Sequence, residues 1–184
     1  MKTITISEII ANNDKAKNIF FIQLQIVVSR QIEHKIRITN TGTTPLPLSW
    51  ALHSYLAISD IDDVAVTGLD GENYLDATDN FKQKTQTGAL QFTGEVDRVH
   101  EGVNQQQQLH LNGEPRLNIL GSDCPTVITW NPGEALASQM ADIKNGYRDF
   151  VCVERGAAFS DELELKAGEH TEAIQILGYA NSTA

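Results

Sequence analysis

Three polar residues in separate strand-like segments have side chains that suit proton transfer. His53 lies in Leu-His-Ser-Tyr (52–55), Asp97 in Gly-Glu-Val-Asp-Arg (94–98), and Glu154 in Val-Cys-Val-Glu (151–154). A carboxylate accepts a proton and an imidazole donates one near neutral pH, so together they can act as general base and general acid. The order of these segments along the chain therefore makes their residues candidates for a shared acid–base site.

Each of these residues also has a simpler structural explanation. A single histidine on a strand is more often structural or exposed than functional. Asp97 stands beside Arg98, and the two could form a surface ion pair of little energetic value. Glu154 ends an apolar strand face, where a carboxylate needs either a partner or a function.

Short apolar–polar alternations dominate the chain, and Gly, Asn, Asp and Pro separate them. Period-two alternation with turn residues at short intervals predicts an all-β chain, and long helical periodicity is nearly absent. Many antiparallel strands of this kind favour a β-sandwich, and no linker divides the chain, so we expect a single domain over residues 1–184. The predicted strands are 19–28, 34–39, 48–58, 63–67, 89–92, 109–111, 116–120, 126–130, 149–154, 162–165 and 172–178, with one short helix between residues 133 and 140.

The alternation is sharpest between residues 48 and 58. It assigns Trp50 and its apolar neighbours to one face, and His53 and Tyr55 to the other. Glu154 shares a face with Phe150 by the same rule. The polar run from 105 to 108, four consecutive glutamines, predicts a solvated hairpin.

Composition excludes several classes of partner. The net charge of −10 and the pI of about 4.8 disfavour binding to nucleic acid and to anionic membranes. No apolar run has the length of a membrane span, and the first residues lack the apolar core of a signal peptide, so we expect a soluble, cytoplasmic protein. Cys124 and Cys152 are expected to be thiols, and the five histidines lack HxH or HExxH spacing, so we expect no metal.

The candidate segments resemble a known family when they are taken with their neighbours. Together with Trp130-Asn-Pro-Gly133 and the Met140-Ala-Asp142 segment, they resemble the aldose 1-epimerase superfamily, and in particular its glucose-6-phosphate (D-hexose-6-phosphate) 1-epimerase branch. The resemblance runs from about residue 20 to 178. It implies a galactose mutarotase-like supersandwich that interconverts the α and β anomers of a hexose or hexose 6-phosphate without a cofactor.

The resemblance also implies roles for the candidate residues. Glu154 is expected to take the proton of O1 while His53 protonates the ring oxygen, with the two groups on opposite sides of the ring. Asp97 is expected to hold sugar hydroxyls, with Tyr55 at the wall of the site and Arg98 as a further substrate contact.

Phosphate recognition is less clearly implied. Most of the basic residues that grip phosphate in the family belong to its N-terminal third, with segments of the type HGFAR, which has no counterpart here. The available candidates are Arg98, Arg148 and Arg155, and we expect all three to be ordinary surface charges. Two alternatives to an enzyme therefore stay open, a non-catalytic carbohydrate-binding sandwich and a subunit that completes another chain.

A sandwich without its relatives' first strands is expected to have open edges. The alternating residues 1–10 can supply one replacement strand, but not a third of a fold. Because open edges and apolar faces pair with other chains, we predict that the protein forms a homo-oligomer or binds a complementary N-terminal fragment. Light scattering at micromolar concentration checks this expectation, and a stable monomer would contradict it.

Overall fold

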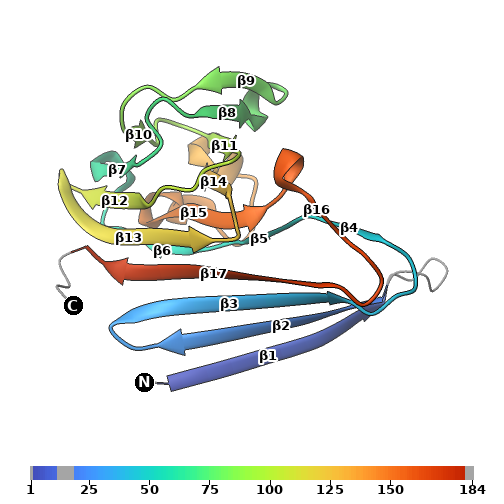
Figure 1. Ribbon diagram of the computed structural model, residues 1–184. Coiled ribbons are helices and arrows are strands. Elements are labelled where there is room, and N and C mark those ends of the chain that lie inside the picture. The colour runs from blue at the N-terminus through green and yellow to red at the C-terminus, as the bar shows by residue number, and fades with distance from the viewer. Residues whose placement is uncertain (1, 12–18, 181–184) are drawn as a thin grey trace.

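Antiparallel pairing joins the strands of the computed structural model, which describes residues 2–11 and 19–180 (Figure 1). Within these residues, one sheet has eight strands and a second has seven, as expected for an all-β sandwich. The eight-stranded sheet runs, in spatial order, β1 (Lys2–Ala11), β2 (Ile19–Val28), β3 (Gln31–Asn40), β17 (His170–Tyr179), β13 (Glu114–Ser122), β12 (Gln107–Leu111), β7 (Val64–Thr67) and β10 (Leu90–Gln91).

The seven-stranded sheet carries the candidate site. Its spatial order is β5 (Trp50–Leu52), β15 (Phe150–Ala157), β14 (Thr126–Asn131), β11 (Val96–His100), β8 (Asn73–Asp76) and β9 (Lys82–Thr85), with β6 (Tyr55–Ala57) also paired to β15. A small pair joins β4 (Leu46–Leu48) to β16 (Leu163–Leu165). The helical segments are α1 (Gly133–Ala137) and the 3₁₀ turns η1 (Ile61–Asp63), η2 (Ala77–Asp79), η3 (Lys144–Asp149) and η4 (Phe159–Asp161). None of the helices in the described ranges has the length and apolar character needed to span a membrane.

The main core lies between the two sheets. Strand alternation directs Val66, Leu109 and Ile119 of the larger sheet toward Val127 and Val151 of the smaller one, and all five are buried in one cluster. Full burial of such a side chain contributes roughly 1.5–3 kcal/mol. The smaller sheet packs on the larger one with this apolar face, and its outer face carries the candidate site. Packing of the inner face therefore holds the strands that carry the site.

A second apolar cluster secures the far end of the larger sheet. Ile36 and Ile38 of β3 pack with Leu48 and Leu165 from the β4–β16 pair. Figure 1 shows β17, β3, β2 and β1 lying side by side below the smaller sheet, with β17 nearest to it and β1 farthest away. The strand expected within residues 1–10 is thus confirmed, since β1 pairs with β2 along its full length.

Two expectations from the sequence need correction. Residues 48–58 form three short strands, because β4 pairs with β16 while β5 and β6 pair with β15. The glutamine run is not wholly solvated, since Gln107 is buried and begins β12 opposite Ile119. Its Nε2 atom donates to the carbonyl of Gln105 at 2.8 Å, which meets part of its hydrogen-bonding need.

An apolar groove of about 780 Å³ opens beside the end of β17. Val28, Ile32 and Tyr179, which line it, are large side chains that remain exposed. Open apolar surface of this kind agrees with the reasoning for self-association, which stays a prediction.

Gly156 lets β5 approach β15 closely enough to pair. A Cβ at this position would lie 2.2 Å from the Trp50 carbonyl oxygen and 2.8 Å from Ala51 Cα. We predict that Gly156→Ala lowers the free energy of unfolding by about 1–3 kcal/mol, because backbone atoms must move apart. Urea unfolding measures the change. Gly146→Ala is the matched control, since its Cβ meets nothing within 4 Å, and it should change stability by less than about 0.5 kcal/mol. Equal stability of the two variants would contradict the argument.

Candidate active site

His53 lies opposite Glu154 because β5 and β6 share one register on β15. Leu52 pairs with Arg155, and Tyr55, three residues further on, pairs with Cys152, three residues back. His53 and Ser54 lie between these strands, so the same register brings His53 to Glu154. The His53 Nε2 atom is 3.3 Å from Glu154 Oε1. The structure thus brings the two residues into direct contact on one sheet face.

A row of directly paired residues runs across four strands beside this contact. Tyr55 pairs with Cys152, Cys152 with Trp130, and Trp130 with Asp97. Cys152 and Glu154 are two residues apart on β15, so the whole row shares the face of Glu154. Asp97 lies two strands from β15, at about 10 Å for two inter-strand spacings. Four of the five predicted site residues therefore share one face.

Aromatic rings form the surface between these polar groups. The rings of His53 and Tyr55 stack with centroids 4.8 Å apart, and Trp130 meets the His53 ring edge-on at 5.7 Å. Phe150 extends the cluster, 5.0 Å from Tyr55 and 5.9 Å from Trp130. Trp130 and Phe150 were not predicted as site residues, because their place beside Tyr55 follows from strand pairing rather than from their local sequence.

Burial shifts the pKa values of Glu154, Asp97 and His53. Burial, and then the charge of Asp97, raises the pKa of Glu154 to about 7 from 4.5. The Asp97 pKa is raised as well, by burial first and then by Glu95 and Asp76, while His53 acts in the other direction. Burial lowers the pKa of His53, and the charge of Asp97 partly offsets this. The two shifts reverse the ordinary order of these pKa values, so a proton shared by Glu154 and His53 is no longer held by the imidazole alone, which suits proton exchange between them.

The turn after β14 holds the segment that leads to Asp97. Asn131 is buried, and its Nδ2 donates to the carbonyls of Tyr147 and Phe150 at 2.9 Å each. Its Oδ1 accepts from the Gly133 amide at 2.8 Å. Gly133 has φ +61°, and a Cβ there would lie 2.6 Å from the Glu95 amide nitrogen. This glycine therefore permits the close approach that fixes the entry to β11.

Arg98 points to the opposite face from Asp97. Its Nη1 donates to Gln86 Oε1 at 2.7 Å, and its guanidinium lies 4.7 Å from the centroid of the Tyr74 ring. Asp97 and Arg98 form no ion pair among those found in residues 2–11 and 19–180. The structure does not bring Arg98 to the other four candidates.

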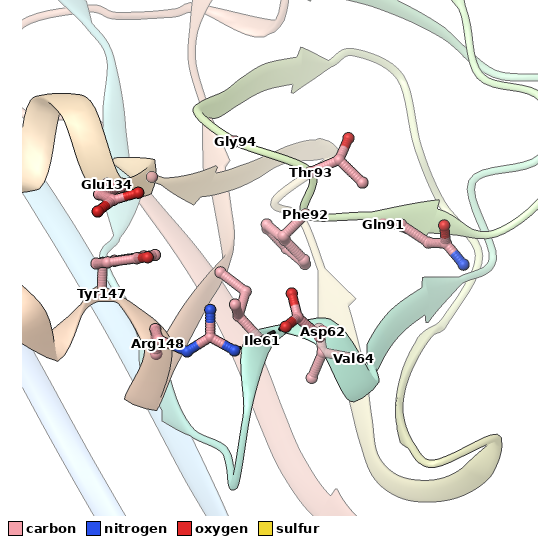
Figure 2. Close-up of a pocket in the computed structure, with 11 residues that line it drawn as sticks. Ile61, Asp62, Val64, Gln91, Phe92, Thr93, Gly94, Glu134, Tyr147 and Arg148 are labelled. Carbon is pink, nitrogen blue, oxygen red and sulfur yellow. Dashed lines mark hydrogen bonds and ion pairs between the residues drawn. The ribbon is translucent and has the colours of Figure 1, made fainter.

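Arg148 lines a separate cavity of about 370 Å³ (Figure 2), which none of the five candidates lines. Its Nη2 contacts Asp60 at 2.5 Å and Asp62 at 2.7 Å, and these carboxylates raise the pKa of the guanidinium. A phosphate would have to displace them. Figure 2 shows the guanidinium directed toward Asp62, while Tyr147 and Glu134 lie at the other side of the cavity.

The prediction that Arg155 is a surface charge is wrong. Arg155 is 1% exposed, because alternation on β15 directs it to the side opposite Glu154, between the sheets. Its guanidinium donates to the carbonyls of Val103 at 2.8 Å and Gln105 at 2.6 Å. Arg155 therefore ties the loop before β12 to the core.

We predict that Glu154 makes stability depend on pH. A folded-state pKa near 7 means that the native protein binds this proton more tightly than the unfolded chain, so the stabilisation is complete below about pH 4.5 and is lost as pH rises through 7. At about 1.4 kcal/mol per pKa unit, the loss is about 3 kcal/mol. Relative to wild type, Glu154→Gln should gain about this much stability between about pH 4 and 8, measured by urea unfolding. Glu164→Gln, at an exposed glutamate, is the matched control. A stability difference for Glu154→Gln that does not change with pH would contradict the shift.

Comparisons with known proteins agree with this geometry. The family profile described as aldose 1-epimerase matches residues 17–178. Provisionally named glucose-6-phosphate 1-epimerases are 32% identical over 138 residues in Cenchrus ciliaris and 36% identical over 113 residues in Escherichia coli. These alignments cover 73% and 59% of the chain, but 42% and 37% of the relatives' own lengths.

Solved structures of low sequence identity share the fold. A provisionally assigned mutarotase from Salmonella typhimurium superimposes with a TM-score of 0.82 at 23% identity, covering 98% of this chain and 61% of that one. A provisionally assigned aldose 1-epimerase from Escherichia coli gives a TM-score of 0.75 at 14% identity, with 96% and 65% covered. With the profile match extending over most of its length, the chain belongs to the aldose 1-epimerase family.

Proposed function

We propose that the protein interconverts the α and β anomers of a hexose or hexose 6-phosphate by acid–base ring opening. The observation that carries this proposal is the 3.3 Å contact between the His53 imidazole and the buried Glu154 carboxylate. Family membership supports an epimerase reaction, while the sugar and the need for a phosphate are part of the proposal.

The contact between His53 and Glu154 suggests how the proton moves. The two groups lie side by side, not on opposite sides of a sugar ring as the family resemblance implies. Side-by-side groups suit the reaction, because O1 and the ring oxygen are bonded to the same carbon. Glu154 takes the O1 proton while His53 protonates the ring oxygen, and after rotation about C1–C2 the same groups act in reverse to close the ring.

The remaining site residues suit sugar binding. Asp97, about 10 Å from β15 by strand spacing, leaves room for a ring between the carboxylates and can accept hydrogen bonds from sugar hydroxyls. Trp130 and Tyr55 offer apolar surface to the C–H face of the ring. Phosphate is less well supported, since Arg98, Arg148 and Arg155 are all engaged within the protein.

The alternative is a carbohydrate-binding sandwich without catalysis, or a subunit that completes another chain. The polar face that carries His53, Asp97 and Glu154 would hold a sugar in this case as well. Sugar binding with anomerisation at the spontaneous rate would support this alternative.

We predict that Glu154→Gln lowers the anomerisation rate at least about 100-fold while leaving sugar binding largely intact, because the amide keeps the shape but cannot act as a base. His53→Asn should reduce the rate by a similar factor. Asp97→Ala should weaken binding as well as rate. Proton NMR of anomer interconversion on glucose, galactose and glucose 6-phosphate measures each effect. Glu164→Gln serves as an exposed glutamate control, and wild-type turnover in both the Glu154 and His53 variants would exclude the assigned roles.

A further inference from the structure

Cys152 adds a thiol to the acid–base pair. One ligand atom each from His53, Cys152 and Glu154 lie within 4.8 Å of one another. Strand geometry produces this cluster, since Cys152 and Glu154 are two residues apart on one face and His53 lies opposite Glu154. The expectation of no metal was based on spacing along the chain, and this group forms between segments a hundred residues apart.

The donor set suits a thiophilic divalent cation. Zn²⁺ binds thiolate, imidazole and carboxylate at about 2.0–2.3 Å in a tetrahedron, which puts donor atoms about 3.3–3.8 Å apart. Donor atoms at the 4.8 Å limit of this cluster therefore need to close by about 1–1.5 Å. His53 can make this adjustment, because it lies between β5 and β6, outside the regular ladder. Hard cations such as Mg²⁺ prefer all-oxygen sites and fit this set poorly.

Burial and charge also favour a cation here. The side chain of Glu154 is 5% exposed, and among the ion pairs found in residues 2–11 and 19–180 it has no lysine or arginine partner; its contact with His53 is an ion pair when the imidazole is protonated. Cys152 is fully buried, with Tyr55 and Trp130 as its partners on the neighbouring strands. The side chain of His53 is 49% exposed and gives the ion a path from solvent. A bound cation would compensate the Glu154 carboxylate and the repulsion from Asp97 together.

We propose that His53, Cys152 and Glu154 bind a thiophilic divalent cation, with Zn²⁺ as its representative, and that a fourth coordination position stays open to solvent. The Cys152 thiol releases its proton to solvent on binding. Anomerisation needs no metal, so an ion held by the acid and the base inhibits it. The inhibition rests on the proposed function, whereas the binding does not.

Cobalt titration of the full chain tests the binding. Co²⁺ takes the place of Zn²⁺ in such sites, and a thiolate ligand gives it a charge-transfer absorption in the near ultraviolet. We expect this band in wild type and in Cys124→Ser, which removes the other buried cysteine, and its loss in Cys152→Ser. His53→Gln keeps the thiol but removes a ligand. Loss of an outer-shell partner weakens metal binding about 10- to 100-fold, so loss of the His53 ligand should weaken cobalt binding by more than this. Circular dichroism confirms that each variant is folded.

The opposite pattern would overturn the site. A missing band in folded wild type, or a band that survives in Cys152→Ser and disappears in Cys124→Ser, excludes the proposal. Inhibition is then measured by the anomer assay. For each variant, the anomerisation rate with Zn²⁺ is compared with the rate of the same variant in the presence of a chelator. If the protein binds cobalt but does not accelerate anomer interconversion, the proposed function is rejected and the proposed metal site is still supported.

Discussion

The shared register of β5 and β6 on β15 is the constraint on which the candidate site depends. Side chains alternate along a strand, so a slip by one residue would bring Ser54 opposite Glu154 and turn His53 to the other side of the sheet. The register is held by backbone pairing at both ends of the gap and by the close approach that Gly156 permits. Packing of Val151 and Val153 on the reverse face keeps β15 in place.

The site conflicts with the stability of the fold. Glu154 and Asp97 are both carboxylates, each at least partly buried on the same face, and neither pairs with a lysine or arginine in the ion pairs found in residues 2–11 and 19–180. Burial raises the pKa values of both, with the charge of Asp97 acting further on Glu154 and the charges of Glu95 and Asp76 on Asp97. Arg155, the nearest arginine in sequence to Glu154, points away into the core. Local arrangements that disfavour stability are typical of functional sites, where chemistry requires groups poised to exchange protons.

The proposed sugar chemistry and the proposed metal binding follow from the same arrangement. His53 lies outside the ladder and is half exposed, while Cys152 and Glu154 are held by a central strand. A half-exposed donor beside two buried ones can receive a sugar oxygen or a cation, but not both together. The aromatic rings of Tyr55 and Trp130 limit the approach of either ligand to the same open face.

The sequence by itself determined those features that follow from the alternation of apolar and polar residues along a single strand. It identified the all-β fold, the family resemblance, and the faces that group His53 with Tyr55 and Glu154 with Phe150, because period-two alternation is local. Pairing between distant strands was not accessible, so the contact of His53 with Glu154, the place of Trp130 and the separation of Arg98 from the site required the tertiary structure. The burial of Gln107 and Arg155 was missed for the same reason. Register between segments a hundred residues apart is set by the packing of the whole sheet, and no local pattern encodes it.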